Sequence, residues 1–272
     1  MSFNMNNVAF SDENAVVYNI LNGVTIQNIP FTILSLSTCT DADSDGWYVE
    51  LEGCNSEPGF LGHGDCNDGN ANINPGAVEI CRDSIDNNCD SDIDIDDSDC
   101  RKIYSIELKT GWNLVSLPAE PLNGNNQVFV HTAESFGQLT GADTVTQWNE
   151  ETQKYAGHIV GYPINNFDIE LGMGFFVHVQ SDSSTEMLGV PLEGITRSVS
   201  VGWNALGWPN LATTAHEFGS LITGASVCSK FDATAQLWDS HIIINPEVNN
   251  FAVNLGDGAM VSTTSASIWS YP

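Results

Sequence analysis

Acidic residues at alternate positions give one short stretch of the chain a strong chemical pattern. The residues that form it are Asp41, Asp43, Asp45, Gly46 and Glu52. They fit positions 1, 3, 5, 6 and 12 of a calcium-binding loop, where oxygen ligands converge on the ion and glycine permits the sharp turn. Position 7 is Trp47, whose backbone carbonyl is the expected further ligand. The spacing predicts a calcium site, and the alternative is an acidic loop that only faces solvent.

Two weaker copies of this spacing follow. The first consists of Asp86, Asn88, Asp90, Asp92, Asp94 and Asp97. The second consists of Asp68, Asn70, Asn72 and Glu79, with Asp65 and Asn67 as neighbours able to contribute from the side. Ser91 and Ile73 replace the turn glycine, and asparagine lowers the charge of the ligand set. The segment therefore predicts two to three Ca²⁺ ions.

The charge balance favours cations as partners. Seven Lys and Arg against 35 Asp and Glu give a formal charge of −28, which repels nucleic acid and anionic membranes. Of the acidic residues, 17 lie between Cys39 and Cys100, where Arg82 is the only basic residue. Such carboxylates repel one another unless they bind ions. Because no stretch of about 18 apolar residues occurs, we expect no membrane span.

The cysteines cluster in the same segment. Six of the seven are Cys39, Cys54, Cys66, Cys81, Cys89 and Cys100. An even, clustered set predicts disulfides and an extracellular location, with the pairing left open. A zinc site is the alternative, but no C-x-x-C pair occurs and His63 is the only nearby histidine. Cys228 lies in an apolar context typical of a buried thiol.

These residues also resemble a known family. The segments that carry the likeness are Cys39 to Tyr48, Asp65-Cys66-Asn67-Asp68, Asn74-Pro75-Gly76-Ala77-Val78-Glu79-Ile80-Cys81 and Ile85-Asp86-Asn87-Asn88-Cys89-Asp90. They resemble the MopE-type metal-binding motif of secreted microbial proteins, which is similar to the calcium loops of thrombospondin type 3 repeats. The family shows glycine where this chain has Ser91. Its name points to copper, but copper prefers His, Met or Cys ligands, so calcium is the better interpretation.

From residue 102 onward the chain predicts β structure in two related halves. The matching segments, in order, are Gly111-Trp112-Asn113 with Gly202-Trp203-Asn204, Phe136-Gly137 with Phe218-Gly219, and Asn165-Asn166-Phe167 with Asn249-Asn250-Phe251. Short helical turns are expected near residues 133–139 and 215–222. The proline, glycine and aromatic residues that separate the apolar stretches favour a small β sandwich or barrel in each half. The halves also resemble the GWN-type modules of secreted bacterial and archaeal surface proteins.

The predicted fold class is mainly β, in four parts. Residues 1–37 form a strand-like extension, 38–101 a disulfide-rich calcium-binding module, 102–194 a first β module and 195–272 a second. Because 37 residues cannot build a core, the extension must lie on another surface. It is either an edge strand of the β modules or a strand donated to a neighbouring subunit, as in a homo-oligomer or filament.

No local catalytic signature occurs, so we expect that the protein is not an enzyme and uses no organic cofactor. Seven tryptophans raise the alternative of a carbohydrate-binding adhesin, in which exposed rings stack on a glycan. Trp112 and Trp203 fit core anchors better, because they recur at matching strand starts. The sequence thus predicts an extracellular calcium-binding structural protein, a subunit of a surface assembly or filament.

Overall fold

The computed structural model describes residues 20–21, 24–25, 39–49, 59–192, 194–209 and 212–271. Within residues 1–37 it describes two short strands, β1 (Ile20–Leu21) and β2 (Val24–Thr25), which pair antiparallel with each other. The rest of the predicted extension lies outside the described residues, so strand donation stays a prediction. No helix in the described ranges is long and apolar enough to cross a membrane.

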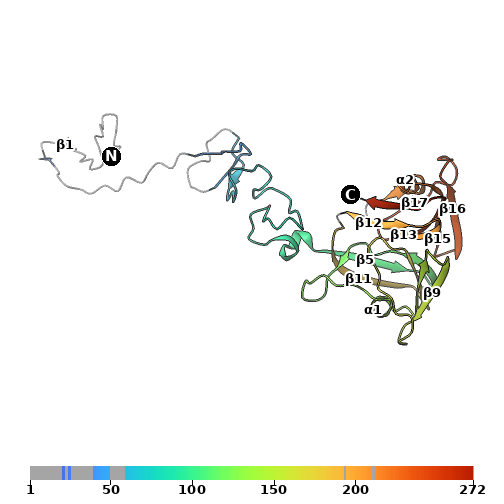
Figure 1. Cartoon of the computed structure of the whole chain (residues 1–272). Helices are drawn as coiled ribbons and strands as arrows, with labels where there is room; N and C mark the ends of the chain where they lie inside the picture. Colours follow the sequence, from blue (N-terminus) through green and yellow to red (C-terminus); the bar gives the residue numbers. More distant parts are fainter. Residues whose placement is uncertain are drawn as a thin grey trace.

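The cysteine-rich segment has little regular structure. It contains strands β3 (Trp47–Tyr48) and β4 (Gly62–His63), which pair in parallel, and the 3₁₀ turns η1 (Asp94–Asp96) and η2 (Ser98–Cys100). Two disulfides, Cys66–Cys89 and Cys81–Cys100, cross-link it. Cys39 is disulfide-bonded as well. With few large aliphatic residues to bury, the segment relies on covalent cross-links, and Figure 1 shows it mostly as loops that lead into β5.

The first β module combines two sheets and one helix. Its elements are β5 (Lys102–Leu108), β6 (Gly111–Val115), β7 (Glu120–Pro121), α1 (Ala133–Thr140), β8 (Thr144–Asn149), β9 (Lys154–Ile159), β10 (Phe175–Val179) and β11 (Ser183–Val190). One sheet has the order β6-β10-β8-β9 and the other β5-β11-β7. Strand β10 shows the period of two: Phe175 and Val177 enter the core below α1, whereas Phe176 enters a separate cluster on the opposite face.

The second β module has a four-stranded sheet in the corresponding order. Its elements are β12 (Ile195–Val199), β13 (Gly202–Gly207), β14 (Thr213–Thr214), α2 (Ala215–Ser220), β15 (Ala225–Asp232), β16 (Leu237–Ile242), β17 (Ala252–Val253), β18 (Gly258–Thr263) and β19 (Ser267–Tyr271). The order β13-β18-β15-β16 matches β6-β10-β8-β9 strand for strand, and β12-β19 and β14-β17 form small further sheets. The mainly β class is confirmed, and none of the described sheets closes into a barrel.

The two expected helical turns are present, and each begins with a capping box. The Thr132 side chain accepts from the backbone N–H of Ser135 before α1, and Thr214 accepts from that of Glu217 before α2. These reciprocal bonds satisfy N–H groups that a helix start leaves unpaired. Phe136 and Phe218 then point from the helices into their respective cores.

The two four-stranded sheets contact one another through reciprocal glutamine contacts. Gln236 accepts from the backbone N–H of Trp112 (2.9 Å) and donates to its carbonyl (2.9 Å). Gln153 does the same at Trp203, at 2.8 and 3.0 Å. A side chain at Gly111 would collide with Gln236, since an added Cβ would lie 2.7 Å from Oε1. The glycine before each tryptophan therefore makes room for the partner sheet's glutamine.

Trp203 is not a core residue, contrary to our expectation, whereas Trp112 packs against the buried cluster of Leu114, Phe176, Ala205 and Met260 between the two sheets. Trp112 is half-buried and Trp203 is exposed, whereas the indoles inside the second module's core are Trp208 and Trp269. The reason is positional, because the side chains at Trp112 and Trp203 flank the contact between the sheets instead of the cores beneath the helices. Cys228 is a buried free thiol, as predicted.

Candidate metal centre

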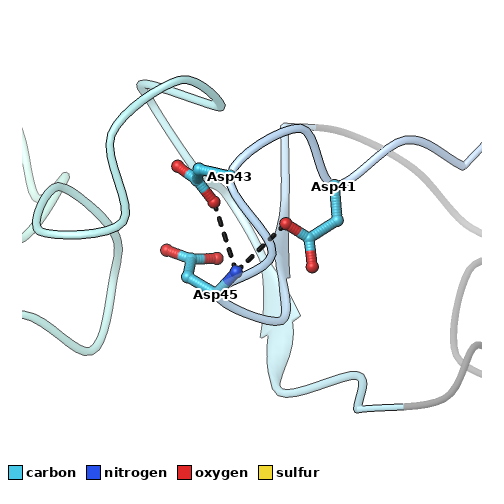
Figure 2. A group of neighbouring side chains, drawn as sticks. All are labelled: Asp41, Asp43 and Asp45. Atoms are coloured by element: carbon cyan, nitrogen blue, oxygen red, sulfur yellow. Dashed lines mark hydrogen bonds between the residues drawn. The ribbon is translucent and has the colours of Figure 1, made fainter.

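The first acidic loop folds its carboxylates around its own backbone. Asp41 and Asp43 each accept a hydrogen bond from the N–H of Asp45, at 3.1 and 3.2 Å, as Figure 2 shows. The second oxygen of Asp41 accepts from Gly46 at 2.9 Å. One carboxylate oxygen from each of the three aspartates lies within 4.8 Å of the others. Alternate side chains of this loop thus converge, as a hard cation requires.

Two buried oxygens at this loop have no hydrogen-bond partner. They are Oδ2 of Asp43 and Oδ2 of Asp65. Asp65 is only 2% exposed, and a buried carboxylate oxygen without a donor or cation is strongly unfavourable. Burial raises the pKa of Asp65, and the charges of Asp45, Asp43 and Asp68 act in the same direction. The unpaired oxygens therefore fit a site that takes a positive charge.

Burial also raises the pKa of Asp43, and the nearby carboxylates of Asp45 and Asp41 add to the effect. A hydrogen bond from the backbone N–H of Asp45 offsets part of this increase. The cause is the same as at Asp65: several negative groups share one poorly solvated volume. A divalent cation would offset both the burial of these carboxylates and the repulsion between them.

Asp65 and Asp68 belong to the first loop's surroundings. The side chain of Asp68 accepts from the backbone N–H of Ala42 at 2.9 Å, and Asp65 accepts from the N–H of Asn67 at 2.7 Å. Sequence spacing had grouped both with a separate third loop. The structure instead places residues 65–68, which follow β4, beside the aspartates of residues 41–45. The spacing of residues within a single loop does not predict a contact between two separate loops.

The first loop is held by its neighbours. Gly46 has φ +91°, and a Cβ there would meet the carbonyl oxygen of Gly59 at 2.5 Å. Asn74 donates from Nδ2 to Asp45 at 2.8 Å. The Trp47 indole packs against Gly62 and Gly76, where an added Cβ would lie 2.3 and 3.0 Å from it. Glu52, the expected ligand at position 12, lies outside the described residues.

The second loop repeats the hydrogen bonds of the first. The N–H of Asp90 donates to Asp86 (3.1 Å) and to Asn88 (3.2 Å), and the N–H of Ser91 donates to the second oxygen of Asp86 (2.9 Å). Ser91 adopts φ +83° where the first loop has glycine. The second loop therefore keeps the hydrogen-bond geometry of the first although it lacks the turn glycine. Ser91 adopts a left-handed backbone conformation, which is unfavourable for a residue other than glycine.

The remaining acidic residues near the second loop differ in how they are engaged. Asp97 is fully buried and accepts from Nδ2 of Asn88 at 2.9 Å, so positions 3 and 12 of this loop meet. Asp94 accepts from the N–H of Ser84, while Asp92 is exposed. Glu79 is buried, and its two oxygens accept from the N–H groups of Asn87 and Asp94. Glu79 thus stabilises the backbone of the second loop through these hydrogen bonds.

The predicted third loop has different geometry. The N–H and the side-chain amide of Asn72 both donate to Oδ1 of Asn70, at 3.3 Å. The N–H of Ile73 donates to the carbonyl of Asn70, and not to Asp68 as position 6 would require. The physical reason is that Asp68 is already engaged by Ala42 and Glu79 by the second loop. Residues 68–79 therefore do not share the convergence of the first two loops.

The available donor atoms fit some metals better than others. Cys39, Cys66, Cys81, Cys89 and Cys100 are all disulfide-bonded, so none offers a thiolate. The His63 ring packs against Phe60, with centroids 4.9 Å apart. The donors that converge in the described residues are carboxylate oxygens, which suit calcium better than copper or zinc.

Comparison with known proteins agrees with a metal-binding segment. Residues 65–94 match the MopE family model, whose description reads "Putative metal-binding motif". No curated protein and no solved structure matches the chain. The match includes the second loop as far as Asp94 and begins at Asp65, which faces the first loop. Together with the disulfides it identifies a metal-binding motif, and both are consistent with an extracellular protein.

Proposed function

We propose that this chain is an extracellular calcium-binding structural protein, with one ion held by Asp41, Asp43, Asp45 and Asp65. The observation that carries the proposal is the pair of buried, unpaired oxygens on Asp43 and Asp65 beside the first loop. A cation at this point would be coordinated by both oxygens and would offset the repulsion among the carboxylates. Removing any one of these carboxylates is expected to weaken calcium binding.

A second ion would occupy the loop of Asp86, Asn88, Asp90 and Asp97. Its hydrogen-bond pattern equals that of the first loop, and Asp97 supplies the buried carboxylate that Asp65 supplies there. Residues 68–72, with Glu79 engaged elsewhere, do not support a third ion of the same kind. We therefore favour two Ca²⁺ ions over three.

Calcium would act by ordering the segment that leads into the β modules. Cys81 and Cys100 pack with Leu122 and Val190 of the first β module in one buried cluster. Arg82 forms an ion pair with Glu120 across the same junction. Ion binding would thus fix the segment's loops against a body to which it is already attached. We propose on this basis a structural, non-enzymatic role in a surface assembly, with residues 1–37 as the contact to a neighbouring subunit.

Calorimetry and hydrogen exchange test this proposal. Titration of the oxidised, chelator-treated protein with CaCl₂ is expected to show two sites, and with CuSO₄ none of comparable affinity. Hydrogen exchange of the amides of Asp45, Gly46, Asp90 and Ser91 should slow on calcium addition. Heat of binding with Cu²⁺ but not Ca²⁺, or unchanged exchange at these amides, would contradict the assignment.

A further inference from the structure

A row of aromatic side chains lines two clefts between the four-stranded sheets. The first cleft, of about 440 Å³, is lined by Trp112, Phe176, Phe231, Tyr155 and Trp238 among others. The second, of about 350 Å³, is lined by Trp148, Trp203, Tyr155 and Trp238 among others. Tyr155 and Trp238 line both, so the two clefts adjoin at these rings, and together we call them the aromatic groove.

The two clefts are built from corresponding positions of the two modules. Trp148 pairs with Tyr155 across β8 and β9, and Phe231 pairs with Trp238 across β15 and β16. The strand orders of the sheets correspond, and the glutamine contacts at Trp112 and Trp203 are reciprocal. The groove therefore has two related halves that meet at Tyr155 and Trp238, and these offer aromatic surfaces to more than one ring of a ligand.

The rings in the groove are held in place yet leave their surface open. Phe176 contacts Trp112, Tyr155, Phe231 and Trp238 edge to face, with centroids 5.6 to 6.4 Å apart. Even so, Tyr155 is 53% exposed and Trp238 46%. Trp203 in the second cleft is 36% exposed. Large aromatic surfaces that cluster without cover are typical of binding sites.

The polar groups in the groove are uncharged. Thr146 lines the first cleft, and Ser229 and Ser240, whose hydroxyl oxygens lie 2.8 Å apart, line the second. Hydroxyls both donate and accept hydrogen bonds. Among the residues that the structure describes, no charged side chain lines either cleft, and the net charge of −28 repels anions. An anionic occupant is therefore disfavoured, and the lining fits a ligand with apolar faces for the rings and hydroxyl edges for the serines and threonine.

We propose that this groove binds a neutral oligosaccharide, with sugar rings stacked on Tyr155 and Trp238 and hydroxyl groups bonded to Thr146, Ser229 and Ser240. A pyranose ring combines an apolar C–H face with a hydroxylated edge, which matches the lining. Glycans that carry carboxylate or sulfate groups would be disfavoured by the charge of the chain. The site lies on the β modules and is independent of the metal centre.

The test uses the full chain in millimolar calcium and measures intrinsic tryptophan fluorescence and calorimetric heat. The probes are cellohexaose, mannohexaose, chitohexaose and, as the charged comparison, hexagalacturonate. At least one neutral hexasaccharide is expected to bind, and hexagalacturonate is not. Binding of hexagalacturonate alone, or no binding of any neutral probe at millimolar concentration, overturns the proposal.

Variants locate the site. Tyr155→Ala and Trp238→Ala should each weaken binding by about tenfold or more, because each removes a ring shared by both clefts. The matched controls are Tyr162→Ala and Leu237→Ala, which remove exposed side chains outside the groove and should leave affinity unchanged. Circular dichroism verifies folding of each variant, and Trp203→Ala provides a second measurement that affects only the second cleft. Unchanged affinity in folded Tyr155→Ala and Trp238→Ala protein refutes the assignment.

Discussion

Replacing Asp65 by asparagine should stabilise the calcium-free first loop and should reduce the further stabilisation that calcium adds. Asp65 is 2% exposed, has an unpaired oxygen, and is repelled by Asp45, Asp43 and Asp68. Without an ion, each like-charge contact near a protein surface costs on the order of 1 kcal/mol or more. Asp65→Asn should therefore stabilise the calcium-free segment by about 1 to 3 kcal/mol.

With calcium the same substitution removes a charged ligand. An extracellular site with a Kd near 10⁻⁴ M contributes about 1.8 kcal/mol at roughly 2 mM calcium. Loss of even a supporting group around a metal typically weakens binding by about 10- to 100-fold. A loss of about 30-fold would leave the ion contributing only about 0.3 kcal/mol at that concentration. The calcium-dependent stabilisation should thus fall by about 1.5 kcal/mol.

Hydrogen exchange of the Asp45 and Gly46 amides, measured in calcium and in chelator, reports on this loop directly. Titration calorimetry gives the affinity. Asp99→Asn is the matched control, since Asp99 lies in the same segment with an exposed side chain. A variant whose exchange is slowed by calcium as much as that of the unsubstituted protein would refute the reasoning, because only an ion at Asp65 makes the effect of calcium depend on this carboxylate.

Further outcomes follow from the same geometry. Ser91→Gly should stabilise the second loop by about 1 kcal/mol, because Ser91 has φ +83°. Gly46→Ala should destabilise the first loop by more than that, because its Cβ would meet a backbone carbonyl at 2.5 Å; chemical denaturation measures both changes. The raised pKa values of Asp43 and Asp65 mean that the folded, calcium-free segment holds protons more tightly than the unfolded chain. Its stability should then fall as pH rises from about 3.8 through the raised values, whereas calcium affinity should rise over the same window, as titrations at several pH values would show. Replacing Cys66 and Cys89 by serine opens a cross-link spanning 23 residues and should cost about 3 kcal/mol, with weaker calcium binding in calorimetry.

Part of the fold can be predicted from the residues alone. The alternation of apolar residues gave the mainly β class, and Thr132 and Thr214 begin the two helices where the sequence places them. The match between residues 65–94 and a metal-binding motif agrees with the acidic and cysteine spacing. The core role expected of Trp203 was wrong, and Trp112 packs only against the cluster between the sheets, because a recurring position does not say how deeply a side chain is buried.

Local spacing determined which residues of this protein converge within one loop. Asp41, Asp43 and Asp45 are close because a tight turn brings alternate side chains to one side of a few residues of backbone. The tertiary structure decided which distant groups join them. Asp65 reaches the first loop, and Tyr155 and Trp238 meet between two sheets, only because separate chain segments pack together. Contacts of that kind depend on packing across the whole fold, which the spacing within one segment does not encode.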